Sequence, residues 1–243
     1  MLENQDLKNV LVLDIETVPQ YAAFEELPED TKELWAYKMR NSINENVTVP
    51  ETYERAGIYA EFGKIVCISV GAFYTENDTL KLRLKSYYGD DEKVILSEFS
   101  EMINKAYSKD EHTLCGHNSK EFDFPYIARR CLINGVPIPF KLDNAGKKPW
   151  EVKLLDTMEL WKFGDYKSYT SMNLLASVLG IRSPKDDIDG SQVGSVYWRD
   201  KDIKRIMTYC QKDVVTVAQV LLRFKGMEIL NEENIIYVNE ELS

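Results

Sequence analysis

The order of strand-like and helix-like segments constrains the fold of this chain more than any other feature of its sequence. Short apolar runs rich in β-branched residues predict strands at 9–14, 64–74, 80–88, 113–117 and 152–156. Helical periodicity and capping residues predict helices at 91–107, 121–134, 171–179 and 200–223. Three strands that can form a meander, followed by strands that alternate with helices, predict an α/β fold with a mixed five-stranded sheet flanked by helices.

The chain is expected to form a single domain over residues 1–243, a length that can bury a sizeable core. Residues 19–62 are polar, with scattered aromatic side chains and helical stretches, and they interrupt the strand pattern. We therefore expect a helical insertion at about 19–62. The acidic tail from Asn231 is expected to pack loosely.

Composition excludes few functions. With 30 basic and 40 acidic residues, the net charge of −10 argues weakly against a protein that holds nucleic acid by charge alone. Acids that ligate cations do not repel nucleic acid in this way, because bound divalent ions reverse the local field. No apolar run reaches the roughly 18–20 residues that a membrane-spanning helix needs, and no secretory signal is expected.

The four cysteines are scattered and form no C-x-x-C pair. This usage predicts reduced thiols and a cytoplasmic location rather than a disulfide framework. His112, Cys115 and His117 lie close together but match no zinc-ligand spacing, so we interpret them as residues of a strand.

The first predicted strand ends in Asp14-Ile15-Glu16. Because side chains alternate along a strand, Asp14 and Glu16 are expected to point to the same side while Ile15 faces the core. Two carboxylates side by side repel each other unless cations lie between them. Such a triplet is also common in a chain with 40 acidic residues, so alone it is weak support for a site.

Two further motifs lie at a strand-to-helix junction and on the last helix. In residues 116–123 (GHNSKEFD), Asp123 is expected in the first turn of a helix, where the helix dipole favours negative charge; plain capping explains it equally well. Tyr209 and Asp213 are four residues apart and are expected to share one helical face. In isolation, a simple hydrogen-bonded pair is the more common reason for that spacing.

Taken together and in this order, the three motifs resemble those of the DEDD exonuclease superfamily: D-x-E at 14–16, N-x-x-x-F-D at 118–123 and Y-x-x-x-D at 209–213. Because the third motif begins with a tyrosine, it resembles that of the DEDDy branch, which includes the proofreading domains of DNA polymerases. The resemblance extends over residues 10–224 and is strongest to predicted 3′–5′ exonucleases related to the proofreading domain of family B polymerases. It implies a ribonuclease-H-like fold and a 3′–5′ exonuclease that releases nucleoside 5′-monophosphates.

The resemblance also implies two divalent cations as cofactors. Asp14 would bridge the two ions, and Asp123 would hold the second of them, partly through water. Glu16 and Asp213 would complete the site of the first ion. Ligands made only of carboxylate oxygen suit Mg²⁺ or Mn²⁺ rather than zinc. Tyr209 would orient the attacking water, because a phenol with a pKa of about 10 is a poor base at neutral pH.

Contacts to a nucleic acid strand are expected as well. By the resemblance, Asn118, Phe122 and backbone groups around Thr17 would bind the substrate near its 3′ end. Candidates for phosphate contacts are the basic residues Lys120, Arg129, Arg130, Lys147, Lys148 and Lys212. Candidates for base stacking are Tyr166, Tyr169 and Trp198. For any one of these residues, an ordinary place on the surface or in the core is more common than a contact with nucleic acid.

Single-stranded DNA is the expected substrate, and the sequence identifies no replication or repair protein as a partner. An RNA 3′–5′ exonuclease of the same chemistry stays open, because recognition of a 2′-hydroxyl is a local contact. A nucleic-acid-binding module without catalysis is a third alternative. The presence of all four acids argues against it, since degenerate copies usually lose one.

Overall fold

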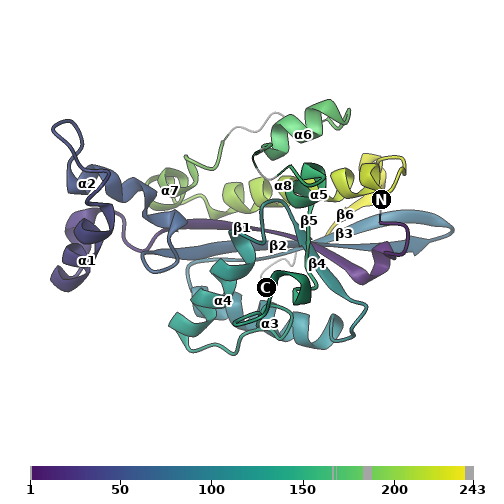
Figure 1. Ribbon diagram of the computed structural model, residues 1–243, viewed down its shortest axis with the longest axis horizontal. Helices are drawn as coiled ribbons and strands as arrows, with labels where there is room; N and C mark the ends of the chain where they lie inside the picture. Colours follow the sequence, from purple (N-terminus) through teal and green to yellow (C-terminus); the bar gives the residue numbers. More distant parts are fainter. Residues whose placement is uncertain (1, 166, 168, 183–187, 239–243) are drawn as a thin grey trace.

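The computed structural model describes residues 2–165, 167, 169–182 and 188–238 (Figure 1). At its centre lies a six-stranded sheet with the strand order β5-β4-β1-β2-β3-β6. The strands are β1 Val10–Pro19, β2 Gly63–Glu76, β3 Thr79–Tyr88, β4 Thr113–Gly116, β5 Leu155–Asp156 and β6 Ile235–Tyr237. Strands β1, β2 and β3 form an antiparallel meander, whereas β4 and β5 run parallel to β1. The predicted α/β class with a mixed sheet is therefore confirmed.

The sheet has one strand more than the five that were predicted. Strand β6, from the acidic tail, pairs in parallel with residues 82–84 of β3. Ile235 packs against the hydrophobic cluster that contains Leu82 and Leu84. The expectation of a loosely packed tail is thus wrong for this stretch. Three residues are too few to show a strand pattern, and their pairing depends on the free edge that β3 offers.

Helices cover both faces of the sheet. Helix α8 (Ile203–Phe224) packs on β1 and β2 on one face, and α3 (Glu92–Ala106) and α4 (Asp123–Asn134) pack on the other (Figure 1). The short helices α5 (Thr157–Lys162) and α6 (Met172–Val178) contact α8, and α7 (Val193–Ser195) contacts β1. Helix α5 lies outside the predicted helices. Within the described residues, no helix is both long enough and apolar enough to cross a bilayer.

Strand β1 places its side chains alternately on the two faces of the sheet. In the core beneath α3 and α4 lie Leu11, Leu13 and Ile15. In the core beneath α8 lie Val10 and Val12. Asp14 and Glu16 continue the second series, so their carboxylates point toward α8. The alternation predicted for the D-x-E triplet is confirmed.

Residues 19–62 form a helical extension at one end of the sheet (Figure 1). It consists of α1 (Glu29–Met39), α2 (Val49–Thr52) and short 3-10 helices at Phe24–Glu26 and Tyr53–Ile58. Its hydrophobic cluster surrounds Trp35, which is fully buried and donates a hydrogen bond to Thr52 Oγ1 at 3.0 Å. Strand β1 continues past the predicted end at residue 14 because its pairing with β2 extends as far as Pro19.

Candidate active site

The carboxylates of Asp14 and Glu16 project from the part of β1 that faces α8. In the pairing of β1 with β2, Asp14 lies opposite Ser69 and Glu16 lies opposite Cys67. A bulge between Glu16 and Thr17 ends the regular register just beyond the two acids. The side chain of Glu16 is 7% exposed and has no hydrogen-bond partner among the described residues. An ionised carboxylate in that setting is costly unless a cation compensates its charge.

Asp123 is tied directly to this stretch of β1. It is the first residue of α4, as predicted, and it is 4% exposed. Its Oδ1 atom accepts a hydrogen bond from the backbone N–H of Ile15 at 3.1 Å. The strand residue between Asp14 and Glu16 therefore holds the third acid in place.

Helix α8 supplies Tyr209, Cys210 and Asp213. Tyr209 forms a hydrogen bond with Asp213 one turn later, which agrees with the predicted shared face. Cys210 is fully buried, and its thiol donates to Asp14 Oδ2 and to Asp14 O, each at 3.4 Å. Sequence reasoning assigned Cys210 no role, because this contact joins residues 196 positions apart.

One open pocket of about 260 Å³ collects these side chains. The acids Asp14, Glu16, Asp123 and Asp213 and the phenol of Tyr209 all line it. The other lining residues are Ile15, His117, Asn118, Phe122, Tyr169, Met172 and Gly190. Thr17 is half-buried beyond the bulge and lies outside this lining. The structure therefore brings together the predicted site residues with the exception of Thr17.

The crowding of acids makes their joint ionisation unfavourable. Burial raises the pKa of Asp14 well above its ordinary value, and the charges of Asp123 and Asp213 raise it further. Burial and the charge of Asp213 raise the pKa of Glu16 in the same way. Burial also raises the pKa of Asp123 to about 7, although the hydrogen bond from Ile15 opposes that shift. Positive charge placed among these groups would relieve the repulsion.

The donor set fits hard divalent cations. Its acidic side chains offer carboxylate oxygens, which are the ligands that Mg²⁺ and Mn²⁺ prefer. The uncompensated carboxylate of Glu16 points to the same conclusion. Within the described part of the chain, ligand atoms of Asp14, Glu16 and Cys210 lie within 4.8 Å of one another, close enough to share an ion.

A residue without a predicted role, Asp156, holds the turn that carries Asn118. Its buried carboxylate accepts the backbone N–H groups of Asn118 and Lys120, each at 3.0 Å, and caps α5 through the N–H groups of Met158 and Glu159. Asn118 adopts a left-handed φ of 60°, which asparagine tolerates better than most residues. Its Oδ1 atom is buried without a hydrogen-bond partner in the described structure, which leaves an unsatisfied acceptor beside the pocket.

Two of the basic residues predicted to contact phosphate are engaged within the protein. Arg130 is 3% exposed, and its guanidinium donates to the two carboxylate oxygens of Glu92 at 2.8 and 2.5 Å. The prediction that Arg130 contacts a substrate is therefore wrong. Lys120 forms an ion pair with Glu159 at 2.5 Å. Arg129 is exposed on the outer face of α4.

The aromatic residues predicted to stack on bases also differ in availability. Trp198 is half-buried, and its indole donates to the carbonyl oxygen of Pro19 at 3.1 Å. Tyr169 lines the carboxylate pocket and is 69% exposed, so its ring can meet a base. Tyr166 lies outside the described residues.

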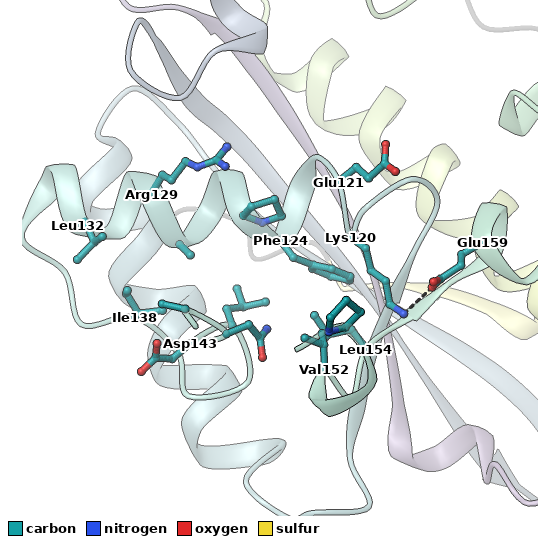
Figure 2. Close-up of a pocket in the computed structure, with 16 residues that line it drawn as sticks. Lys120, Glu121, Phe124, Arg129, Leu132, Ile138, Asp143, Val152, Leu154 and Glu159 are labelled. Atoms are coloured by element: carbon teal, nitrogen blue, oxygen red, sulfur yellow. Dashed lines mark hydrogen bonds and ion pairs between the residues drawn. The ribbon is translucent and has the colours of Figure 1, made fainter. Parts of the chain in front are cut away.

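A larger hollow of about 690 Å³ lies beside the turn that contains Lys120, between α4 and the loop at 138–154 (Figure 2). Apolar side chains, including Phe124, Leu132 and Leu154, line it, and the Lys120–Glu159 ion pair lies at one end. None of the four predicted acids reaches this hollow. Chemistry rather than size therefore identifies the smaller pocket as the candidate active site.

Comparison with protein families gives a match over residues 58–240 to a family described as predicted 3′–5′ exonucleases related to the exonuclease domain of PolB. The chain belongs to this family. The family resemblance predicted from the motifs is confirmed. The matched segment contains Asp123, Tyr209 and Asp213, whereas Asp14 and Glu16 precede it and join the site through the folding of β1.

Comparison with solved structures shows that this member of the family is similar in fold to part of a family B DNA polymerase. The family B DNA polymerase of the hyperthermophilic archaeon Pyrobaculum calidifontis is similar with a TM-score of 0.55 and 18% identity, over 88% of this chain and 24% of that chain. This chain thus spans about a quarter of the polymerase's length. The RNase domain of the yeast Pop2 protein gives a TM-score of 0.44 and 12% identity, over 97% of this chain and 83% of that chain. No curated protein matches the chain.

Proposed function

We propose that this protein is a divalent-cation-dependent 3′–5′ exonuclease that releases nucleoside 5′-monophosphates from single-stranded DNA. The observation that carries the proposal is the meeting of four acids and a tyrosine, from β1, α4 and α8, in one open pocket. Membership of a family related to the exonuclease domain of a DNA polymerase supports both the direction of cleavage and DNA as substrate.

Asp14, Glu16, Asp123 and Asp213 would hold two ions, Mg²⁺ or Mn²⁺, whose charge would stabilise the attacking and leaving oxygens of the displacement at phosphorus. The protein's own part is to hold the four carboxylates close together. The hydrogen bonds from Ile15 to Asp123 and from Cys210 to Asp14 fix two of them. Because the carboxylates are preorganised, little reorganisation is required when a phosphodiester enters.

Tyr209 positions the attacking water in this proposal. Its O–H donates to the carboxylate of Asp213, so the phenolic oxygen still has a lone pair that can accept a hydrogen bond from water. Asp213 thereby orients the phenol of Tyr209, and Tyr209 orients the water.

The 3′ end of the strand is proposed to lie against Asn118, Phe122 and Tyr169, which line the pocket beside the acids. The unpartnered Oδ1 of Asn118 would accept a hydrogen bond from a sugar hydroxyl or a base N–H. Phe122 and Tyr169 would stack on bases, an interaction that contributes roughly 1–3 kcal/mol per base. Such contacts are tolerant of sequence, as a degradative enzyme requires.

The test uses 5′-labelled single-stranded DNA and RNA of matched sequence, with Mg²⁺, with Mn²⁺ and with EDTA. We expect stepwise shortening from the 3′ end that requires the ion and is faster on DNA. Asp14→Asn should abolish it, whereas Asp143→Asn, a matched change in the larger hollow, should not. Faster shortening of RNA would overturn the choice of substrate. No release from either strand would leave only a binding module and overturn the enzyme.

A further inference from the structure

The thiol of Cys210 lies behind the carboxylate pocket, outside the residues that line it, and contacts Asp14 from that side. It is fully buried behind Asp14 and Glu16, and its sulfur is 3.4 Å from Asp14 Oδ2. Ligand atoms of these three residues lie within 4.8 Å of one another. Glu16, 7% exposed and without a hydrogen-bond partner in the described structure, directs an unsatisfied carboxylate into the same space. Cys67, which pairs with Glu16 across β1 and β2, adds a second buried thiol that hydrogen-bonds with Cys210.

This geometry agrees with tetrahedral coordination of zinc. Zinc binds cysteine sulfur at about 2.3 Å and carboxylate oxygen at about 2.0–2.2 Å, so tetrahedral angles place sulfur and oxygen about 3.6 Å apart. The distance of 3.4 Å between Cys210 Sγ and Asp14 Oδ2 is close to that value. The cations Mg²⁺ and Mn²⁺ favour oxygen ligands, whereas zinc and other soft cations favour a thiolate. The thiol therefore gives the site a preference for soft cations, which the carboxylates alone would not have.

We infer that Asp14, Glu16 and Cys210 form a site for a thiophilic divalent cation such as Zn²⁺. Binding releases the thiol proton to solvent, so the cation is held by one thiolate and two carboxylates, with water as a fourth ligand. Because Asp14 and Glu16 are shared, this cation excludes Mg²⁺ or Mn²⁺ from the same carboxylates. Zinc thus acts as an inhibitor of the nuclease, a regulatory property that rests on the proposed function, whereas the binding itself does not.

Titration of the full chain with Co²⁺, a spectroscopic substitute for Zn²⁺, tests the site directly. Ligation by a thiolate produces a sulfur-to-cobalt charge-transfer band in the near ultraviolet, which carboxylates do not produce. We expect the band to saturate at one equivalent in the wild type, to disappear when Zn²⁺ is added, and to withstand millimolar Mg²⁺. Cys210→Ser should lose the band, whereas Cys115→Ser, a matched change of a buried thiol in β4, should keep it.

If the wild type shows no band, the proposed site is wrong, whatever the variants show. The test therefore does not depend on whether Cys210→Ser folds. Retention of the band in a folded Cys210→Ser would equally overturn it. Inhibition is measured separately, with each protein normalised to its own zinc-free rate. Cys210→Ala should require at least about tenfold more Zn²⁺ for half inhibition than Cys115→Ala. Loss of a residue that binds the metal directly should lower metal affinity at least as much as loss of a residue that only hydrogen-bonds a ligand. Nuclease activity without the band leaves the proposed function intact and removes the zinc site; the band without nuclease activity does the reverse.

Discussion

At the scale of single residues, burial in the pocket changes the pKa values of the side chains that line it. Burial and the charge of Asp213 raise the pKa of the Tyr209 phenol above its ordinary value, so the phenol stays protonated at neutral pH. It cannot then serve as a base, but it can hold one hydrogen bond to Asp213 and accept another from water. Its contribution to the proposed reaction is therefore orientation.

Replacing Tyr209 with Phe should lower kcat by roughly 10²-fold, the usual effect of removing one preorganised hydrogen bond in an active site. Affinity for the strand should change little, because the aromatic ring remains. The measurement is single-turnover shortening of labelled DNA together with strand binding in EDTA. Tyr107→Phe, which alters a buried tyrosine at the end of α3, is the matched control. An unchanged rate for Tyr209→Phe would reduce that residue to a structural one.

Asp123 gives a prediction about pH in the absence of divalent ions. Burial raises its pKa to about 7 in the folded protein, against about 3.9 in an unfolded chain. The folded state therefore binds the extra proton, and this contribution to stability is complete below pH 4 and is lost as the pH rises through 7. In EDTA, Asp123→Asn should gain stability relative to the wild type by up to about 1.4 kcal/mol per pH unit in that window.

Urea unfolding of both proteins at pH 5, 6.5 and 8 measures this difference. Saturating Mg²⁺ should reverse the ranking at pH 8, because ion binding to the folded wild type stabilises it by mass action. A difference between the two proteins that does not vary with pH would contradict the prediction.

At the scale of elements, β1, α4 and α8 each bring acids to the pocket, and the turn between β4 and α4 aligns Asn118, a proposed substrate contact. Asp156 organises that turn without lining the pocket. It joins the 118–120 segment to the start of α5 through four backbone N–H groups. Loss of its carboxylate would leave buried donors without partners.

Asp156→Ala should reduce the free energy of unfolding by about 1–3 kcal/mol and lower the rate of DNA shortening even where the protein is fully folded. The matched control is Asp91→Ala, because Asp91 caps α3 by accepting two backbone N–H groups and does not line the pocket. That change should cost about 0.5–2 kcal/mol and leave the rate unchanged. Equal rates for both variants would show that Asp156 has no part in aligning Asn118.

At the scale of the whole molecule, a buried ion pair between α3 and α4 joins these helices to the helical extension. Arg130 of α4 holds Glu92 of α3 and also donates to the carbonyl oxygen of Ala60 at 2.9 Å and to Gln20 Oε1 at 3.1 Å. Ala60 and Gln20 lie near the two ends of the 19–62 segment. A single guanidinium therefore anchors both ends of the extension.

Arg130→Met should destabilise the protein by about 3–5 kcal/mol, because it leaves the Glu92 carboxylate buried without its partner. Hydrogen exchange should accelerate across residues 19–62 before it accelerates in β1 or α8. Arg129→Met, at the adjacent exposed position of the same helix, should change stability by less than about 0.5 kcal/mol. Similar losses in both variants would contradict the anchoring role.

The sequence by itself determined the features that depend on local periodicity. Alternation along a strand set Asp14 and Glu16 on one side, helical spacing set Tyr209 above Asp213, and the strand-to-helix junction set Asp123 in a first turn. These relations hold within a few residues, where backbone geometry alone decides which side chains share a face.

Tertiary structure decided the contacts between distant segments. The thiol of Cys210 beside Asp14, the burial of Arg130 against Glu92 and the hold of Asp156 on Asn118 join residues that no local pattern relates. Strand β6 formed because the edge of β3 was free to pair. Each of these features depends on which surfaces meet when the sheet and helices pack, so a local pattern in the sequence carries no trace of it.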